Sequence, residues 1–517
     1  MTAASSRLGD LVAALPLTPV PDNPPGWEDL TVHGVRSDNR RVGGGELFAG
    51  HGGAHVHGAR YARDAVGAGA TAVLTDPAGA ELLAREGSLG VPVLVAEDVP
   101  ALLGELAAAV YGRPAEALGT FAVTGTNGKT STVYMLDHAL RSLGRTTGLI
   151  GTVEVRVAGR SEPAVLTTPQ PADLQALLAD MVATGVTDMS MEVSSHALGL
   201  RRVDPVVFDV AGFTNLSQDH LDYHGTLEQY FAAKASLFAP ARSRRGVVVV
   251  DDSWGRRLAE TAAAERPGAV ASLSVQGHDA DWRVTEITGE GQGHTFTLIH
   301  RDGRRLRTGT GLPGGFNVTN AALAAAMVLT SGVEPDRLEA SLAAAGGLTP
   351  VIPGRMEQLA DFPRVIVDFA HNPGALQQAV DALRATTAGR LVLVFGATGS
   401  RDRGKRPQMA QVAVDGADAV VIADDDPHDE SPDQIRAELL AAADAHRPGS
   451  QVREIGNRAE AIRTAVLEAA EEDTVLVAGR GHEKIQEVAG VDHHLDDREE
   501  VRAALALRPG RAGGSAR

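Results

Sequence analysis

The sequence predicts an α/β protein built from three domains. At 517 residues the chain is too long for one hydrophobic core, because single cores stop growing near roughly 300 residues. Short apolar runs typical of strands alternate with Ala- and Leu-rich stretches of helical spacing, the pattern of parallel sheets with helical connections. Gly- and Pro-containing stretches at 111–114 and 346–354 interrupt this pattern. We therefore expect domains at 1–110, 111–349 and 350–508, and a disordered Gly/Arg/Ser-rich tail at 509–517.

The N-terminal domain is expected to contain strands at 71–75 and 91–96, separated by helices. The segment 34–58 differs from its surroundings, because it is polar and rich in Gly, His and Arg. Judged on its chemistry alone, this segment is a surface loop.

A candidate phosphate-binding loop opens the central domain, which should hold a mainly parallel sheet. Residues 121–131 read F-A-V-T-G-T-N-G-K-T-S, and apolar residues follow at helical spacing, so the Gly-rich turn connects a strand to a helix. Glycines let several backbone N–H groups converge, and the helix N-terminus adds positive potential. Lys129 supplies a mobile cation and Thr130 a hydroxyl for magnesium, as in a nucleoside triphosphate site. Val123 replaces the first Gly of the general pattern, so a Gly-rich turn with an exposed lysine is the alternative.

Polar residues also follow two further strands predicted in this domain. The stretch 188–196 alternates as a strand does, and its end presents Glu192, Ser194, Ser195 and His196. A carboxylate there can bind the magnesium of a nucleotide held by the neighbouring loop. The strand at 206–213 leads into 214–224, which is dense in acidic and histidine residues. This loop is a metal or catalytic candidate, and a solvated loop is the alternative; the residues concerned are Asp219, His220, Asp222 and His224.

Lys234 is predicted to lie on the apolar face of the next helix, in line with Leu227, Phe231 and Phe238. A bare ammonium on such a face is unfavourable. Either the side chain extends to water, or carbon dioxide has converted it to a carbamate, which would be an anionic metal ligand beside the His220 loop.

The last domain is predicted to be an open, Rossmann-like parallel sheet with its site at the carboxyl edge of the strands. Charged loops follow the strands predicted at 365–369, 391–395, 420–423 and 475–477. Just before this domain, Asn317 and Asn320 precede an Ala-rich helix at 321–329, where they suit helix capping or base recognition.

The composition excludes several functional classes. A net charge of −18 argues against nucleic acid and anionic membranes as partners. The absence of cysteine excludes disulfides, thiol catalysis and cysteine-ligated metals. The first 15 residues lack the basic opening of a signal peptide, and no apolar run approaches a membrane span. We expect a cytoplasmic protein.

Nine segments, in this order, resemble the Mur ligases, which are ATP-dependent amide-forming enzymes of peptidoglycan precursor synthesis. The resemblance covers nearly the whole chain, and it is closest to the MurE branch, which adds the third residue of the stem peptide. The segments read G-T-N-G-K-T-S, T-T-P, M-E-V-S-S-H-A-L, F-T-N-L-S-Q-D-H-L-D-Y-H, Y-F-A-A-K, F-N-V-T-N-A, G-R-M-E, D-F-A-H-N-P and G-R-G-H-E.

The resemblance implies a role for each matched residue. ATP would be bound by Thr124, Gly125, Thr126, Asn127, Gly128, Lys129, Thr130, Ser131, Asn317, Arg355, Asp368 and His371. One magnesium ion would be held by Thr130 and Glu192, and a second by His220 and carbamylated Lys234. The catalytic set would be Lys129, Glu192, His220 and Lys234. The sugar-nucleotide peptide UDP-N-acetylmuramoyl-L-alanyl-D-glutamate would contact Ser37, Asn39, Thr167, Thr168, Ser194 and Arg202, with its uridine end on the segment 34–58. The incoming amino acid would contact Arg401, Asp425, Asp426, Pro427, His428, Gly479 and Glu483.

The implied reaction transfers the γ-phosphate of ATP to the side-chain carboxylate of D-Glu, and the amino group of a dibasic amino acid then attacks the acyl phosphate. Members that add meso-diaminopimelate usually carry D-N-P-R, where this chain has D-D-P-H at 425–428. His428 offers one donor where an arginine would offer a fork. The sequence therefore favours L-lysine or L-ornithine and leaves diaminopimelate open. Asn39, where the family usually has Ser, is a second departure.

Two alternatives remain at this stage. A folylpolyglutamate-synthase-like ligase would share the phosphate loop but would not need a uridine-binding domain. A catalytically silent homologue would serve as a partner or regulator, although the complete set of Lys129, Thr130, Glu192, His220 and Lys234 argues against it. A monomer is expected.

Overall fold

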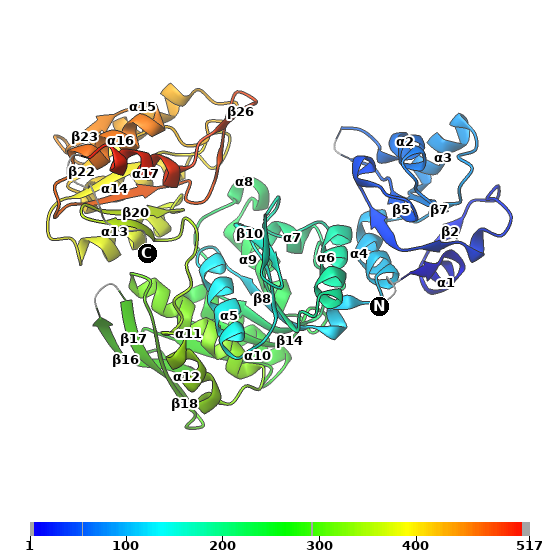
Figure 1. The fold of residues 1–517 in the computed structure, drawn as a ribbon, viewed down its shortest axis with the longest axis horizontal. Helices are drawn as coiled ribbons and strands as arrows, with labels where there is room; N and C mark the ends of the chain where they lie inside the picture. Colours follow the sequence, from blue (N-terminus) through cyan, green and yellow to red (C-terminus); the bar gives the residue numbers. More distant parts are fainter. Residues whose placement is uncertain (1–4, 54, 291–292, 509–517) are drawn as a thin grey trace.

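The computed structural model describes residues 5–53, 55–290 and 293–508. Three α/β units follow one another along the chain, and the first (blue) and last (yellow to red) lie on different sides of the central one (Figure 1). Their main sheets have five, eleven and six strands, which confirms the predicted fold class. The tail expected to be disordered, 509–517, lies outside the described residues. None of the described helices has the length and apolarity needed to cross a membrane.

The N-terminal unit is a small sheet of strand order β2-β7-β6-β5-β4, parallel from β4 to β7. Adjacent residues of a strand face opposite sides, so Leu47 and Phe48 enter two separate apolar clusters. The strands are β1 (Ser6–Arg7), β2 (Thr18–Pro19), β3 (Thr31–Val32), β4 (Gly34–Arg36), β5 (Glu46–Ala49), β6 (Ala72–Thr75) and β7 (Val93–Val95). The helices are α1 (Leu8–Ala14), α2 (Ala62–Gly67), α3 (Pro77–Glu86) and α4 (Val99–Val110).

The segment 34–58 is not simply the surface loop that its composition suggests. It contains β4 and β5, and all four residues of β5 are buried. The apolar run of β5 is too short to stand out between glycines, and only pairing with β4 and β6 buries it. The polar remainder, including Ser37 and Asn39, follows the carboxyl ends of these parallel strands.

The central sheet has the order β11-β10-β9-β12-β8-β13-β14-β15-β16-β17-β18. It is parallel from β9 to β16 and antiparallel at both edges. α5, α11 and α12 cover one face, and α6, α7, α9 and α10 the other. The strands are β8 (Gly119–Thr124), β9 (Thr147–Ile150), β10 (Glu154–Val157), β11 (Arg160–Pro163), β12 (Asp188–Glu192), β13 (Phe208–Phe213), β14 (Ser243–Val249), β15 (Val270–Ser274), β16 (Trp282–Glu290), β17 (Gly293–His300) and β18 (Arg305–Thr310). The helices are α5 (Lys129–Ser142), α6 (Pro171–Ala183), α7 (Ser195–Gly199), α8 (Leu221–His224), α9 (Leu227–Ala235), α10 (Ser253–Glu265), α11 (Gly315–Thr330) and α12 (Pro335–Ala344).

α11 begins earlier than the sequence predicts. Its N-cap is Gly314, so Asn317 and Asn320 lie inside the helix and do not cap it. Both are buried, and the Asn317 side chain donates to the Pro313 carbonyl at 2.8 Å. Asparagine and β-branched residues lower the helix propensity of this segment, so the sequence alone does not predict a helix there. Burial against α5 outweighs that low propensity.

The C-terminal unit is a sheet of order β19-β20-β24-β21-β22-β23, parallel except at β19. α13, α14 and α15 cover one face, and α16 and α17 the other. The strands are β19 (Glu357–Asp361), β20 (Arg364–Asp368), β21 (Leu391–Phe395), β22 (Ala419–Ile422), β23 (Val452–Glu454) and β24 (Thr474–Ala478), with a hairpin of β25 (Ile485–Val488) and β26 (Val491–His494). The helices are α13 (Pro373–Arg384), α14 (Lys405–Gly416), α15 (Pro432–His446), α16 (Arg458–Glu468) and α17 (Asp497–Ala506).

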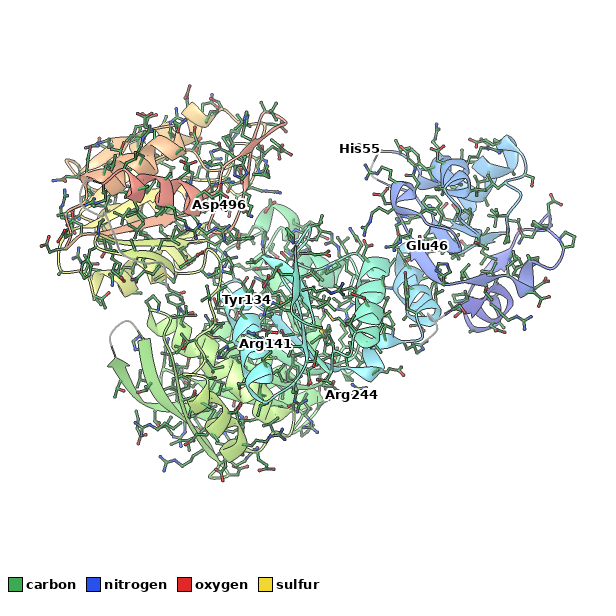
Figure 2. The ribbon with its side chains drawn as sticks, viewed as in Figure 1. Glu46, His55, Tyr134, Arg141, Arg244 and Asp496 are labelled. Atoms are coloured by element: carbon green, nitrogen blue, oxygen red, sulfur yellow. The ribbon has the colours of Figure 1, made fainter. Side chains whose placement is uncertain are left out.

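Polar contacts tie the N-terminal unit to the central one. The Arg36 guanidinium contacts Glu46, labelled in Figure 2, at 3.0 Å and Asp173 of α6 at 3.4 Å. Arg41 also reaches Asp173, at 3.2 Å. Arg36, at the end of β4, and Arg41, which follows it, therefore face the central domain.

Candidate active site

Three loops leave the central sheet at one edge. Pairing of the parallel strands places Glu192 beside Val123 and Phe213 beside Thr124. The phosphate loop, the segment after Glu192 and the loop after β13 therefore start side by side, at the carboxyl edge where α/β proteins bind ligands.

The predicted phosphate loop has the expected strand–turn–helix form. Gly128 has a φ of +87°, and a Cβ at Gly125 would collide with the Thr214 hydroxyl, so both positions require glycine. The Lys129 ammonium donates to the carbonyl oxygens of Gly125, at 3.0 Å, and Thr126, at 2.8 Å. Burial lowers the pKa of Lys129. The lysine is thus held against the loop where a phosphate would lie.

Thr130 and Glu192 meet as predicted. The Thr130 hydroxyl donates to Oε2 of Glu192 at 3.0 Å, and Glu192 is 1% exposed. The backbone N–H of Thr152 holds the other carboxylate oxygen at 2.8 Å. A hydroxyl and a carboxylate are oxygen ligands that Mg²⁺ prefers.

The predicted peptide-binding residues surround Glu192. Thr168 donates to the Glu192 carbonyl at 2.9 Å and accepts from the Ser194 N–H at 3.1 Å. Arg202 donates to the Thr168 carbonyl at 3.3 Å, and the hydroxyls of Thr152 and Thr167 are 3.1 Å apart.

Lys234 lies on the buried face of α9, as its helical position predicts, and its side chain does not extend to water. Its ammonium donates to the Gly125 carbonyl at 2.6 Å and lies 4.4 Å from the centre of the Tyr230 ring. Burial first, and then the positive charge of Lys129, hold the pKa of Lys234 well below its usual value. His220 lies 6.1 Å from the Tyr230 ring centre, and desolvation lowers its pKa to about 4, so its ring is neutral at neutral pH.

Contacts between the central and C-terminal units complete the site, and sequence reasoning missed them. Asn127 of the phosphate loop and Asn372 exchange side-chain hydrogen bonds, at 3.0 and 3.4 Å. Asp219 lies 3.7 Å from His371 and accepts from the His220 N–H at 3.0 Å. Burial would raise the pKa of Asp219, but His371, His220 and Lys405 together hold it below its usual range. Paired asparagines far apart in sequence carry no local signal.

Three of the residues predicted to bind ATP, namely Arg355, Asp368 and His371, lie in the C-terminal unit, whereas Asn317 lies in α11 of the central unit. The Arg355 guanidinium stacks 4.2 Å from the Phe369 ring centre and lies 3.3 Å from His482. Asp368 accepts from the Met356 N–H at 2.6 Å, and burial raises its pKa. A flat aromatic face with an arginine and a carboxylate can hold a base and a ribose.

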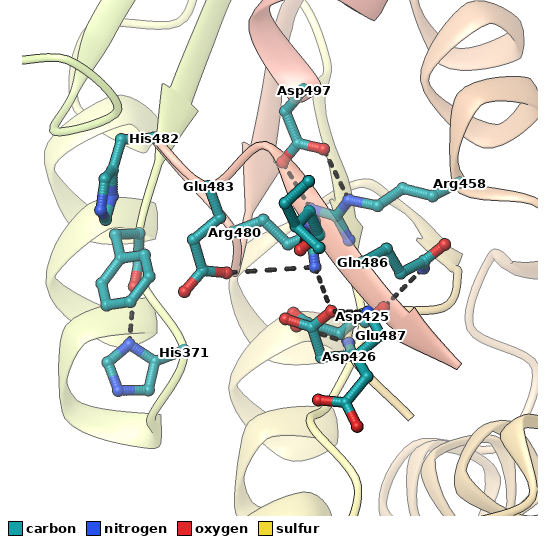
Figure 3. A network of polar contacts seen from close by, with 12 residues as sticks. His371, Asp425, Asp426, Arg458, Arg480, His482, Glu483, Gln486, Glu487 and Asp497 are labelled. Carbon is teal, nitrogen blue, oxygen red and sulfur yellow. Dashed lines mark hydrogen bonds and ion pairs between the residues drawn. The ribbon is translucent and has the colours of Figure 1, made fainter. Parts of the chain in front are cut away.

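An acidic cluster lies at the far end of the site (Figure 3). We use this name for Asp425, Asp426, Glu483 and Glu487. Arg480 pairs with Asp426 at 2.7 Å, and His428 pairs with Glu487 at 2.9 Å, while Oδ2 of buried Asp425 has no hydrogen-bond partner among the described residues. Burial, followed by the charges of Asp425 and Asp426, raises the pKa of Glu483 to about 8. The cluster therefore carries more negative charge than its neighbours neutralise, which suits a cationic ligand.

One cavity of about 1300 Å³ joins these elements across the two units. Most predicted site residues line it, including Lys129, Glu192, His220, Lys234 and Arg401. Thr124, Gly125 and Pro427 do not line it, and neither do Ser37 and Asn39, which lie on the N-terminal unit. Within the described residues, no three His, Asp or Glu side chains converge as a ready-made metal site. A metal here would need ligands from its substrate as well.

Comparison with known proteins finds a match to each of the three units. Three family models fit the chain: Mur ligase family, catalytic domain (31–111), Mur ligase middle domain (123–328) and Mur ligase, glutamate ligase domain (354–481).

Similar full-length proteins are also known. A Streptomyces coelicolor protein named UDP-N-acetylmuramoyl-L-alanyl-D-glutamate–2,6-diaminopimelate ligase is 43% identical over 96% of this chain and 98% of its own. A Leifsonia xyli protein named UDP-N-acetylmuramyl-tripeptide synthetase is 45% identical over 92% of each. A solved structure of a protein named UDP-N-acetylmuramoyl-L-alanyl-D-glutamate–2,6-diaminopimelate ligase is 31% identical to this chain. The match has a TM-score of 0.63 and covers 97% of this chain and 99% of that one. The chain belongs to the Mur ligase family of ATP-dependent ligases.

Proposed function

We propose that this protein joins a dibasic amino acid to UDP-N-acetylmuramoyl-L-alanyl-D-glutamate, with conversion of ATP to ADP and phosphate. One observation carries the proposal: a phosphate loop with its Thr130–Glu192 pair faces an acidic cluster across a single cavity. Such a cavity can hold a nucleotide at one end and a cationic amino acid at the other. The names of the relatives support the same reaction.

The residues present fit a metal-bound nucleotide. Thr130 and Glu192 would hold one Mg²⁺, and His220 with a carbamylated Lys234 a second; the metal charge would offset that of the phosphates. The carbamate is supported by the environment of Lys234, because only a neutral amine reacts with carbon dioxide, and this lysine is buried with a lowered pKa.

In the first step, an oxygen of the D-Glu side-chain carboxylate attacks the γ-phosphorus of ATP. The bond to the β–γ bridging oxygen breaks, and ADP leaves. Lys129, held beside the loop, stabilises charge on the transferring group. In the second step, the amino nitrogen of the incoming acid attacks the acyl carbon, phosphate leaves with the C–O electrons, and the nitrogen loses a proton to water.

The acidic cluster supports a diamino acid as the second substrate. Asp425, Asp426 and Glu483 would border its side-chain ammonium, and Gly479, which has no side chain, would leave room for it. Arg401 lines the same cavity and would bind the α-carboxylate through two parallel hydrogen bonds. Relatives are named for 2,6-diaminopimelate. His428, however, is already paired with Glu487, which leaves it less able to bind the second carboxylate of diaminopimelate. The acidic pocket therefore favours lysine or ornithine, which lack that carboxylate.

The uridine end of the substrate would lie on the N-terminal unit, near Ser37 and Asn39. The matching catalytic-domain model supports this placement and distinguishes the proposal from folylpolyglutamate synthesis. A folylpolyglutamate synthase structure is only 20% identical, which shows the shared fold alone. We further propose that the protein acts as a monomer in the cytoplasm, where nucleotide-activated precursors and ATP are both present.

A coupled assay of ADP release tests the proposal. The purified protein should release ADP over repeated turnovers when ATP, the UDP-muramoyl dipeptide and a diamino acid are all supplied, and no ADP without the dipeptide. Release with a folate substrate instead, or none with any diamino acid, would contradict the assignment.

A further inference from the structure

Lys405 is a buried cation that the proposed reaction, as described so far, does not use. Five lysine and arginine side chains are buried in the part of the chain that the structure describes: Lys234, Lys405, Arg406, Arg458 and Arg480. The three arginines are neutralised by carboxylates: Arg406 by Glu430 and Glu438, both at 2.7 Å, Arg458 by Asp497 at 2.7 Å, and Arg480 by Asp426 at 2.7 Å. Lys234 has the Gly125 carbonyl. Among the described residues, the Lys405 ammonium makes no hydrogen bond and no ion pair within 4.0 Å, although it is near enough to Asp219 to help lower the pKa of that carboxyl.

The position of Lys405 indicates that an anionic partner would reach it through the cavity. It is the first residue of α14, only 6% exposed, and its side chain lines the cavity. Asp402, on the loop just before it, accepts from the Gln218 side chain of the central unit at 3.0 Å. Thr398, Arg401 and His371 line the same cavity. Lys405 therefore lies where the C-terminal unit meets the loop that carries His220.

The Lys405 side chain is nine-tenths buried, and its ammonium opens only onto the cavity. A cation held in this way is favoured when an anionic partner enters the cavity. The reaction places anions in this cavity: the acyl phosphate and the α-carboxylate of the incoming amino acid. Both present negatively charged oxygens of the kind that an ammonium binds strongly.

We propose that Lys405 is a substrate-binding residue, whose ammonium contacts an anionic oxygen of the acyl phosphate or of the incoming α-carboxylate. This inference rests on the proposed function, and it adds a cation from the C-terminal unit to the one that Lys129 supplies from the phosphate loop.

The absence of cysteine from the chain allows a direct test. In Lys405→Cys, the introduced thiol is the only one, and 2-bromoethylamine converts it to an ammonium of nearly lysine length. Iodoacetamide gives a neutral side chain of similar size. Arg403→Cys, treated identically, is the matched control, because Arg403 is exposed on the same loop, pairs with Glu430 at 2.8 Å and does not line the cavity. Intact mass establishes each modification, and the melting temperature establishes folding.

Two readouts separate the two anions. Hydroxylamine traps the acyl phosphate as a hydroxamate without any amino acid, whereas the KM for the amino acid reports binding of its carboxylate. We expect the neutral form to lose about tenfold to a hundredfold in one readout and the ammonium form to recover it. A fall in hydroxamate formation assigns Lys405 to the acyl phosphate, and a rise in KM alone assigns it to the carboxylate.

The inference is overturned if Lys405→Met and the neutral cysteine adduct keep rates within about twofold of the unmodified protein in both readouts. It is also overturned if the ammonium adduct is no better than the neutral one. Failure of the proposed function would look different, because the unmodified protein would then form neither hydroxamate nor peptide.

Discussion

His428→Arg should shift the preference of this protein toward diaminopimelate. In the structure, Nδ1 of His428 lies 2.9 Å from Oε2 of Glu487, so only the second ring nitrogen is available to a ligand. His428 lines the cavity next to Asp426. A guanidinium has enough N–H donors to keep the hydrogen bond to Glu487 and also to donate two hydrogen bonds to the second carboxylate of diaminopimelate.

The expected gain follows from the contacts exchanged. Replacing one contact by a bidentate charged pair is worth about 1–3 kcal/mol, or roughly fivefold to 150-fold in kcat/KM. The neighbouring carboxylates of Asp425 and Asp426 repel the incoming carboxylate, so we expect the lower half of that range. The kcat/KM for lysine should change little, because lysine lacks the second carboxylate.

The assay compares kcat/KM for lysine, ornithine and meso-diaminopimelate on the unmodified protein and on His428→Arg. Glu487→Gln is the control, since it frees His428 without adding a fork. If the unmodified protein already prefers diaminopimelate by about a hundredfold, the carboxylate anchor lies elsewhere and the argument from His428 is wrong.

Three further predictions concern the rest of the site. Lys129→Met should keep the fold, because the lysine bonds only to two loop carbonyls, yet reduce kcat by about a hundredfold or more; near-normal turnover would disprove the phosphate-loop assignment. Carbon-13 dioxide should label Lys234, Lys234→Ala should lose activity, and a small added carboxylate should partly restore it; a free ammonium in the active, nucleotide-bound protein would refute the carbamate. Because the pKa of Glu483 is about 8, Glu483 is mostly protonated at pH 7, so binding of a cationic amino acid should release protons and tighten as pH rises toward 8. Calorimetry in buffers of different ionisation enthalpy measures this release, which should disappear in Glu483→Gln.

Local patterns in the sequence were sufficient for the main elements of the fold. The strand–turn–helix around Lys129 and the strand ending at Glu192 follow from apolar spacing and from glycines that need positive φ. The burial of Lys234 also follows from its helical position. These features depend on residues that are neighbours in sequence.

Features that depend on distant neighbours could not be predicted. β5 is buried only because β4 and β6 flank it, and α11 extends over Asn317 because α5 packs against it. The Asn127–Asn372 pair joins residues of different units. Lys405 looks like an ordinary polar residue of a helix start, and only the fold shows that it is buried and faces the cavity.

The central claim is that this site phosphorylates the D-Glu side-chain carboxylate before the amide forms. Oxygen-18 in that carboxylate tests it most directly, with mass spectrometry of the phosphate and the peptide product. The account predicts that each turnover moves one oxygen-18 from the carboxylate into inorganic phosphate. Unlabelled phosphate, with the displaced oxygen-18 recovered in water or with no amide product at all, would contradict it.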